Sequence, residues 1–374
     1  MRLKKFLIKK MLKQIIYAIK IESFRKLGYP NILPSNVMIA TTYMCNSHCR
    51  MCNVWSKYKK NPKKLKEEMS MNEFIEFVNK NRFLIKIALT GGEPFLRDDL
   101  YDMIIFLNEK GYNTEITTNA ILTDKIKSEE SKILNNLSGD IPHTLTISID
   151  GLEKSHDNLR GIKGNFKKAI ELLRWCIQQK NKYDFFETSI SHTITQNNYL
   201  EFPDFFTYFI NFGLKPEQIT FRLAQTSSYY FENVKSNEIS TDFLQIHEQI
   251  KKVLDKHTNL KSDIFYQGLL KYLRNPNNQV LPCMAALSFC YIDPYWNVYP
   301  CMSWTKSIGN LRNFNFDLKK IWNSESMKQS RELIKNEKCQ NCWTQCVAIP
   351  TISSNILVLP KRYLNLLKHI KIFR

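Results

Sequence analysis

Short apolar runs and longer amphipathic segments alternate along the first two thirds of the chain. The runs predict strands at residues 36–42, 84–90, 113–118, 143–150, 185–195 and 218–224. The segments of helical period predict helices at 70–81, 98–110, 121–137, 165–179, 199–212 and within 240–257. Six strand–helix pairs in series predict an α/β fold with a parallel sheet. Function in such sheets collects at the carboxyl ends of the strands, so the residues just after each run are the candidates for chemistry.

The rest of the chain lies on either side of this series. Residues 3–20 predict a basic amphipathic helix, which either packs on the domain or lies at a membrane interface. Its apolar stripe is Leu3, Leu7, Met11, Ile15 and Ile19. Residues 225–282 are predicted to be helical, and a cysteine-rich segment follows. The predicted parts are an N-terminal helix in 1–35, the strand–helix series in 36–257, a small second domain in 258–350 and a basic amphipathic tail in 351–374.

The charge of the chain is concentrated at its ends. Of 54 Lys+Arg and 35 Asp+Glu, residues 1–26 hold nine basic and one acidic residue, and residues 338–374 hold six basic and no acidic residues. Such ends attract anionic surfaces, either membrane headgroups or nucleic acid. No apolar run is long enough to span a bilayer and no cleavable signal peptide is evident. We therefore expect a cytoplasmic protein, and peripheral contact of its basic ends with a membrane surface is one of the two interpretations of those ends.

Nine of the ten cysteines fall into two groups at short spacings. The first group is Cys45, Cys49 and Cys52, and the second is Cys283, Cys290, Cys301, Cys339, Cys342 and Cys346. Cys176 stands alone in a predicted helix and is interpreted as a buried residue without a role. Because cytosolic thiols stay reduced, clustered cysteines there favour metal ligation over disulfides.

The first group forms one short loop directly after the first predicted strand. Three thiolates at the spacing Cys45-x3-Cys49-x2-Cys52 can bind three corners of a [4Fe–4S] cube and leave the fourth iron open to another ligand. A zinc site completed by His48 or by a distant cysteine is the alternative that spacing alone leaves open.

This loop and the turn after the second strand resemble the signature of the radical S-adenosylmethionine (SAM) superfamily. Residues 43–53 read YMCNSHCRMCN, and a Gly-Gly-Glu-Pro turn follows one strand later. Glycines let a backbone approach a ligand closely. The resemblance implies that Gly91, Gly92, Glu93 and Pro94 bind SAM near the amino group of its methionine moiety.

The third and fourth strand ends match the same family, in the segments ITTN, SIDG, HD and RG. The resemblance implies that Asn119, Ser148, Asp150 and Arg160 bind SAM. Arg160 could pair with the methionine carboxylate, because a guanidinium matches carboxylate geometry. A salt bridge at a helix start is the alternative for Arg160. Arg222, at the end of the sixth strand, faces the same mouth and is a weaker candidate.

The resemblance implies both a fold and a cofactor set. The fold is a partial (β/α)6 TIM-like barrel, and the cofactors are SAM and a [4Fe–4S] cluster with an open iron. In this family the cluster reduces the sulfonium, a C–S bond breaks, and a 5′-deoxyadenosyl radical removes a hydrogen atom from the substrate. The protein orients the parts and excludes competing reactions, so no catalytic side chain is assigned beyond the cofactors. A one-electron donor such as flavodoxin or ferredoxin is the expected partner.

The segment 283–301 resembles the hairpin of SPASM or twitch auxiliary-cluster domains. Trp296 stands where those domains usually have glycine, so Asn297 is predicted to supply any left-handed residue of the turn. Six cysteines here are fewer than the seven of a full SPASM domain, so one auxiliary [4Fe–4S] cluster is expected. Structural zinc is the alternative. The predicted ligands are Cys283, Cys301, Cys339 and Cys342, with Cys290 and Cys346 as alternatives.

The substrate is the least constrained part of the prediction. A fully ligated auxiliary cluster would accept or pass an electron, which favours oxidation or bond formation after hydrogen abstraction. About 35 residues precede the first strand, too few for a separate peptide-binding domain. Lysines at 57, 59, 60, 63, 64 and 66 either attract an anion or form a solvated loop. We expect a carbohydrate-like or anionic small molecule, with maturation of a ribosomally made peptide as the alternative.

An alternative from another class is a non-catalytic zinc- or cluster-binding protein that uses its basic ends on nucleic acid. The enzyme interpretation expects no nucleic-acid partner. The metal content of anaerobically purified protein separates the two, because two cubes contain about eight irons and the alternative contains zinc.

Overall fold

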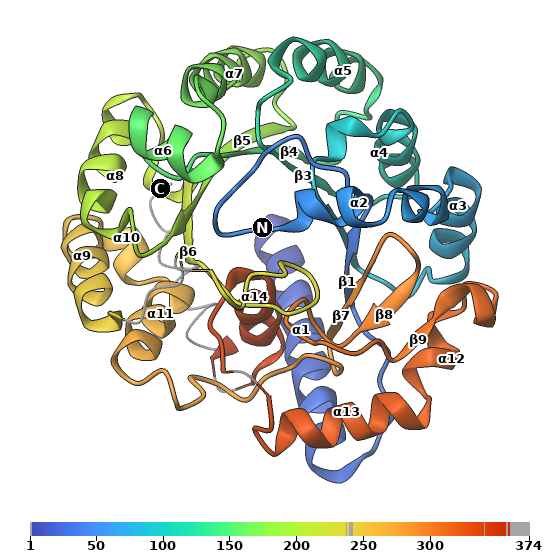
Figure 1. Ribbon diagram of the computed structural model, residues 1–374. Helices are drawn as coiled ribbons and strands as arrows, with labels where there is room; N and C mark the ends of the chain where they lie inside the picture. Colours follow the sequence, from blue (N-terminus) through green and yellow to red (C-terminus); the bar gives the residue numbers. More distant parts are fainter. Residues whose placement is uncertain (1, 237, 239–241, 340, 357, 360–374) are drawn as a thin grey trace.

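Six strands, each followed by a helix, form an open barrel with helices around the outside (Figure 1). The computed structural model describes residues 2–236, 238, 242–339, 341–356 and 358–359, and side chains from residue 15 onward. The six strands are β1 (Asn36–Ala40), β2 (Lys86–Thr90), β3 (Thr114–Thr118), β4 (His143–Ser148), β5 (Phe186–Ile194) and β6 (Ile219–Leu223). All their pairings with one another are parallel. The predicted α/β fold and partial barrel are confirmed.

Helices follow the strands at nearly the predicted positions. Those of the barrel are α3 (Met71–Lys80), α4 (Leu100–Glu109), α5 (Thr123–Asn136), α6 (Glu153–Arg160), α7 (Asn165–Lys180), α8 (Phe202–Asn211) and α9 (Phe243–Lys256). The others are α1 (Arg2–Leu27), α2 (Lys57–Lys60), α10 (Thr258–Lys261), α11 (Ile264–Arg274), α12 (Leu318–Trp322), α13 (Glu325–Lys335) and α14 (Gln345–Ser354). Cys176 is fully buried in α7, as predicted.

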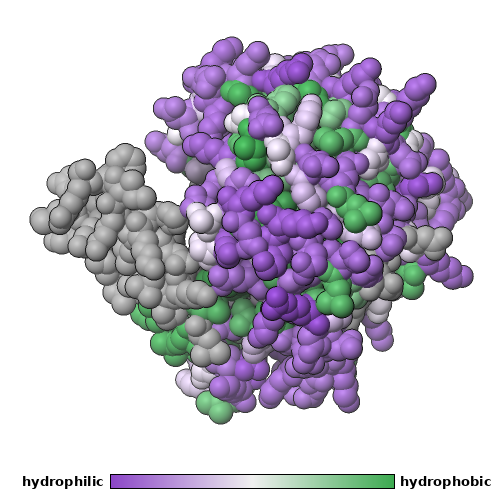
Figure 2. Space-filling view, turned by 90° about the vertical axis from the view of Figure 1, so that its left-hand side faces the viewer, coloured by the Kyte–Doolittle hydropathy of each residue, from purple (hydrophilic) through white to green (hydrophobic). Residues whose placement is uncertain are grey.

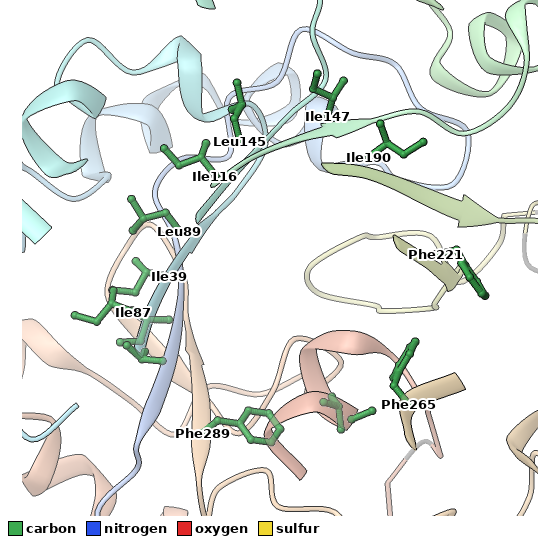
Figure 3. Close-up of a cluster of buried hydrophobic side chains, with 14 of the residues drawn as sticks. Ile39, Ile87, Leu89, Ile116, Leu145, Ile147, Ile190, Phe221, Phe265 and Phe289 are labelled. Carbon is green, nitrogen blue, oxygen red and sulfur yellow. The ribbon is translucent and has the colours of Figure 1, made fainter. Parts of the chain in front are cut away.

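Apolar side chains on the outer face of the strands form the main core. Successive residues of a strand point to opposite faces, and Leu89, Ile116 and Ile147 point from the barrel wall towards the helices (Figure 3). On β6, Phe221 is fully buried and stacks on Tyr266 of α11 with ring centroids 4.3 Å apart. This burial fixes which face of each strand looks outward.

The inner face of β4 and β5 is polar by the same alternation. Thr146 and Ser148 of β4 lie opposite Ser189 and Ser191 of β5, and the hydroxyls of Thr146 and Ser189 are 2.9 Å apart. Packed TIM barrels fill their interior with bulky branched side chains. Small hydroxyl side chains in their place indicate a barrel whose interior receives polar ligands.

The cysteine-rich hairpin continues the barrel sheet. Its strand β7 (Phe289–Ile292) pairs in parallel with β1, and β8 (Asn297–Tyr299) and β9 (Gly309–Asn310) extend the sheet to the order β2-β1-β7-β8-β9. The second part of the chain is therefore hydrogen-bonded directly to the first strand of the barrel. The boundary at residue 258 stays a prediction.

The turn of this hairpin corrects one prediction. Trp296 itself adopts the left-handed conformation (φ 68°), and Asn297 does not. Asp293 accepts hydrogen bonds from the backbone N–H of Tyr295 and of Asn297, at 2.9 and 2.8 Å, which sets the turn. The Trp296 indole is fully buried, and its N–H donates to Glu73 at 3.2 Å. Burial of the large ring offsets the cost of the left-handed backbone.

Two further predictions are corrected outside the barrel. The described part of residues 225–242 is a non-helical loop, whereas α9, α10 and α11 account for the rest of the predicted helical stretch. In α1, Ala18 and Ile21 are fully buried, while Ile19 of the predicted stripe is 50% exposed. The helix packs against α14, and the face that carries Ala18 and Ile21 is the buried one. Contact with the domain therefore determines which face of α1 is buried.

The ends of the chain were predicted to contact a membrane. The side chains of Leu3, Leu7 and Met11, and the predicted tail from residue 360 onward, lie outside the described residues. Within the described part, no helix has both the length and the apolarity to cross a bilayer. The face in Figure 2 is mostly hydrophilic, with hydrophobic residues in small separate groups.

The stacking of Phe221 on α11 gives a stability prediction. Phe221→Ala should cost about 3–5 kcal/mol, because it removes a fully buried ring between β6 and the helices. Anaerobic thermal unfolding should show a midpoint several degrees lower. Leu244→Ala is the control, because that side chain is 67% exposed and should change little. Equal midpoints for the two variants would contradict this packing.

Candidate cofactor and cluster site

The loop that carries the first cysteines lies against the Gly-Gly turn after β2. The backbone N–H of Gly92 donates to the carbonyl of Thr42 at 2.8 Å, and that of Glu93 donates to the carbonyl of Met44 at 2.7 Å. A Cβ on Gly92 would stand 2.1 Å from the Met44 carbonyl oxygen, and one on Gly91 2.4 Å from that of Thr42. Only glycine permits this contact, so Gly91 and Gly92 fix the position of the loop.

The end of α6 holds the same loop from the other side. The backbone N–H groups of His48 and Arg50 donate to the carbonyls of Arg160 and Leu159, at 3.1 and 2.9 Å. Gly161 caps α6 in the left-handed conformation, and a Cβ there would stand 2.6 Å from the His48 carbonyl oxygen. The loop is thus clamped between two glycine turns that are far apart in sequence.

The three thiols of the loop lie close enough to influence one another. Burial, together with the adjacent Cys49, raises the pKa of Cys45 and of Cys52 to about 12. Thiolates at such a site require a compensating cation, which iron would supply. Among the described residues, no three Cys, His, Asp or Glu side chains are spaced for a single metal ion. A cube gives each thiolate its own iron, and three neighbouring buried thiols fit such a cluster.

Glu93 connects the Gly-Gly turn to the next strand end. Its carboxylate is fully buried and accepts from the backbone N–H of Asn119 at 2.7 Å and from the Thr118 hydroxyl at 2.9 Å. Burial raises its pKa to about 7. The side chain therefore positions Asn119, whose amide donates to Asn46 at 2.8 Å and lies 3.9 Å from the Cys45 sulfur. Pro94 is buried and begins a short 3₁₀ turn.

An ion pair joins the fourth strand end to α6. Arg160 Nε lies 2.6 Å from Asp150 Oδ2, and both residues are buried. Arg160 Nη1 is 3.7 Å from the sulfur of Cys49. Burial alone would raise the pKa of Asp150, but the Arg160 guanidinium keeps it below its ordinary value. The salt bridge expected as the alternative role of Arg160 is present, at the end of its helix.

The predicted SAM-binding residues thus share one end of the barrel. Asn119 and Arg160 reach the first cysteine loop directly, and Asp150 reaches it through Arg160. Ser148 is buried at the end of β4, paired in register with Ser191. Their contact with SAM remains a prediction.

Five cysteines of the second group gather in one place. Burial raises the pKa of Cys342 well above its ordinary value, and the other four thiols raise it further. Those four are Cys301, Cys283, Cys346 and Cys339. Cys290 is separate: burial alone raises its pKa to about 12, and it lies on β7 in the hydrophobic core. The structure brings Cys346 to the predicted ligands and leaves Cys290 away from them.

The sequence analysis missed a group of tyrosines that joins the two cysteine regions. The loop after β6 supplies Tyr230, whose hydroxyl donates to the Gly91 carbonyl at 2.9 Å. Tyr43, beside the first cysteine loop, shares a 2.9 Å hydrogen bond with Tyr291 of β7. Tyr229 donates to Asp293 of the hairpin turn at 2.5 Å. The adjacent pair Tyr229-Tyr230 was the available signal, in a stretch predicted to be helical.

Comparison with known families agrees with this geometry. The radical SAM superfamily matches residues 39–204, and an iron–sulfur cluster-binding domain, SPASM, matches residues 283–343. Together they span more than half of the chain. The protein therefore belongs to the radical SAM superfamily and carries a C-terminal SPASM domain. It is a radical SAM enzyme, and its cofactors are SAM, a [4Fe–4S] cluster and an auxiliary iron–sulfur cluster. Membership of this enzyme family argues against the non-catalytic alternative.

The similar proteins carry names that indicate different activities. An AdoMet-dependent heme synthase of Nitratidesulfovibrio vulgaris is 24% identical over 78% of this chain and 79% of its own. The sporulation killing factor maturation protein SkfB of Bacillus subtilis is 25% identical over 67% of this chain and 60% of its own. The solved structure of anSMEcpe with AdoMet and a Cp18Cys peptide has a TM-score of 0.60 and 16% identity, covering 90% of this chain and 100% of that chain. The last comparison shows a shared fold.

The clamp on the first loop gives a prediction at one glycine. Gly92→Ala should prevent the loop from closing, because its Cβ would overlap a backbone carbonyl. The anaerobically reconstituted variant should lose about four irons and all 5′-deoxyadenosine formation. Gly139→Ala is the control, since its Cβ would stand an ordinary 3.7 Å from Phe185. A Gly92→Ala protein with full iron content would exclude this clamp.

The ligand set of the second group has its own prediction. Cys342→Ala should remove the auxiliary cluster, because Cys342 is influenced by all four neighbouring thiols. Cys290→Ala should keep the iron content and the visible charge-transfer absorption of the wild type. Cluster loss in Cys290→Ala, with retention in Cys342→Ala, would reverse the assignment.

Proposed function

We propose that this radical SAM enzyme oxidises, or forms a bond within, a carbohydrate-like or anionic small molecule. When bound, the cluster and SAM supply the one-electron reduction and the hydrogen-atom abstraction of the superfamily. The proposal depends on one observation: Cys283, Cys339 and Cys342 line one small pocket, and the thiols of Cys301 and Cys346 are close enough to Cys342 to affect it. These thiols are enough to ligate every iron of an auxiliary cube. A cube without an open iron suits electron transfer better than substrate binding.

Each residue then has a role that its contacts support. Cys45, Cys49 and Cys52 hold the first cluster, and the two glycine turns keep the loop in place. Arg160 lies beside Cys49 and is oriented by Asp150, where it can bind the methionine carboxylate of SAM.

For the auxiliary cluster we propose Cys283, Cys301 and Cys342 as ligands. Cys339 or Cys346 would be the fourth. Cys339, the predicted one, is less enclosed than Cys346. Iron-bound in this way, the four thiolates would keep solvent and substrate away from the cube.

The lysine run supports an anionic substrate less than its sequence suggested. Lys57 and Lys60 pair with Glu232 at 2.7 and 2.8 Å, and Lys64 pairs with Glu67. Two carboxylates thus engage three of the six lysines, which favours the solvated-loop alternative. Recognition of an anion would therefore fall to residues inside the barrel.

Peptide maturation is the second candidate function. It is favoured by the relative named as a maturation protein and by the peptide in the anSMEcpe structure, whereas the relative named for heme synthesis favours a small molecule. An electron donor such as flavodoxin or ferredoxin, and contact of the basic ends with a membrane, complete the proposal.

Deuterium transfer can identify the substrate class. Holoenzyme with SAM and a reductant would be incubated with small-molecule or peptide fractions from cells grown in deuterated medium. We expect deuterium in 5′-deoxyadenosine from the small-molecule fraction, because the abstracted atom comes from the substrate. Label from the peptide fraction alone would establish the second candidate instead.

The control for this experiment is the Cys45→Ala, Cys49→Ala, Cys52→Ala variant, which should form no 5′-deoxyadenosine from either fraction. The proposed function would be overturned if the wild type formed no 5′-deoxyadenosine in any incubation, with or without either fraction.

A further inference from the structure

Arg222 occupies an inward-facing position near the end of β6. Its neighbours Phe221 and Leu223 are buried in the core, so strand alternation directs Arg222 to the opposite face. It lies in register with Thr193 of β5 and is half-buried. A long cationic side chain therefore projects from the part of the wall where β4 and β5 carry small hydroxyl groups.

The charge of Arg222 has no counterpart within the described part of the chain. No hydrogen bond or ion pair joins its guanidinium to another described residue. The buried carboxylates that follow the strand ends are already engaged, because Asp150 pairs with Arg160, and Glu93 accepts from Thr118 and a backbone N–H. A half-buried charge is stabilised by a partner, and a guanidinium offers five donors that match an oxyanion bidentately.

Arg222 lies near both cysteine groups, since its neighbours Leu223 and Ala224 line a small pocket together with Cys342 of the second group. Its positive charge acts on Tyr230, which lies beside Cys52 and Cys45 of the first group. The same charge acts on Cys346 of the second group. A ligand bound to Arg222 would therefore lie within reach of both cluster sites.

We propose that Arg222 anchors the substrate by an anionic group, a carboxylate or a phosphate, near both cluster sites. The inference rests on the proposed function and narrows its substrate class. Arg160 and Arg222 then bind different anions. Arg160, beside Cys49, binds the carboxylate of SAM, and Arg222 binds the anionic group of the substrate. This division places the reacting part of the substrate inside the polar barrel.

Chemical modification of the holoenzyme tests the assignment without a known substrate. Anaerobic protein with SAM would be treated with phenylglyoxal, and each arginine would be quantified by mass spectrometry. Arg222 should be modified, whereas Arg160, which is buried and ion-paired, should not. Succinate or inorganic phosphate should lower modification of Arg222 several-fold. Arg274, exposed at the end of α11, is the internal control and should be modified equally with or without either anion.

The two anions separate the two chemistries, since protection by succinate alone indicates a carboxylate and protection by phosphate alone a phosphate. Three results would overturn the proposal: no modification of Arg222, no protection by either anion, or full protection of Arg222 by SAM alone. Calorimetric titration of the protective anion gives a second measurement, in which Arg222→Gln should abolish binding and Arg222→Lys should weaken it. If the wild type formed no 5′-deoxyadenosine, the proposed function would be wrong. The labelling of Arg222 could still be interpreted, because it does not depend on turnover.

Discussion

The close approach of the cysteine loop to the Gly-Gly turn is the constraint on which the site depends. Two backbones lie so close that a single methyl group at Gly92 would overlap a carbonyl oxygen. The contact sets where Cys45 stands relative to the strand ends, and Gly161 repeats the arrangement on the other side of the loop. A cluster ligand held by backbone contacts is more rigid than one held by side chains alone, which suits a cofactor that must meet its partner at a fixed distance.

The hairpin of the SPASM domain shares this rigidity because it is built into the barrel. Pairing of β7 with β1 makes the auxiliary site an extension of the strand that leads into the first cysteine loop. Tyr43 and Tyr291 then bond across this junction, and Tyr230 reaches back to the Gly-Gly turn. The two cysteine groups are therefore held at a fixed separation by one continuous sheet and its aromatic contacts.

The inside of the barrel differs from the outside in a way that allows chemistry. The outer face buries large apolar side chains under the helices, and this burial stabilises the fold. The inner face carries hydroxyl groups from Thr146, Ser148 and Ser191, and a cationic group from Arg222. A wall of this kind can bind a polar cofactor and substrate without loss of the core, because stability and binding use opposite faces of the same strands.

The sequence alone determined the strand–helix order and the first cysteine site, because both are encoded in local patterns. Period-2 runs, capping residues and closely spaced cysteines need no knowledge of distant contacts, and the six strands lie within a few residues of their predicted positions. The resemblance of its motifs to a known family also indicated Gly91, Gly92, Asn119, Asp150 and Arg160, which the structure places around the first cysteine loop. The tertiary structure alone decided the contacts between distant segments. It brings Cys346, and not Cys290, close to Cys342, it gives Trp296 the left-handed position, and it brings Tyr230 to Gly91. These depend on which face of a strand looks inward and on which loops meet in space, and no local pattern of residues specifies either.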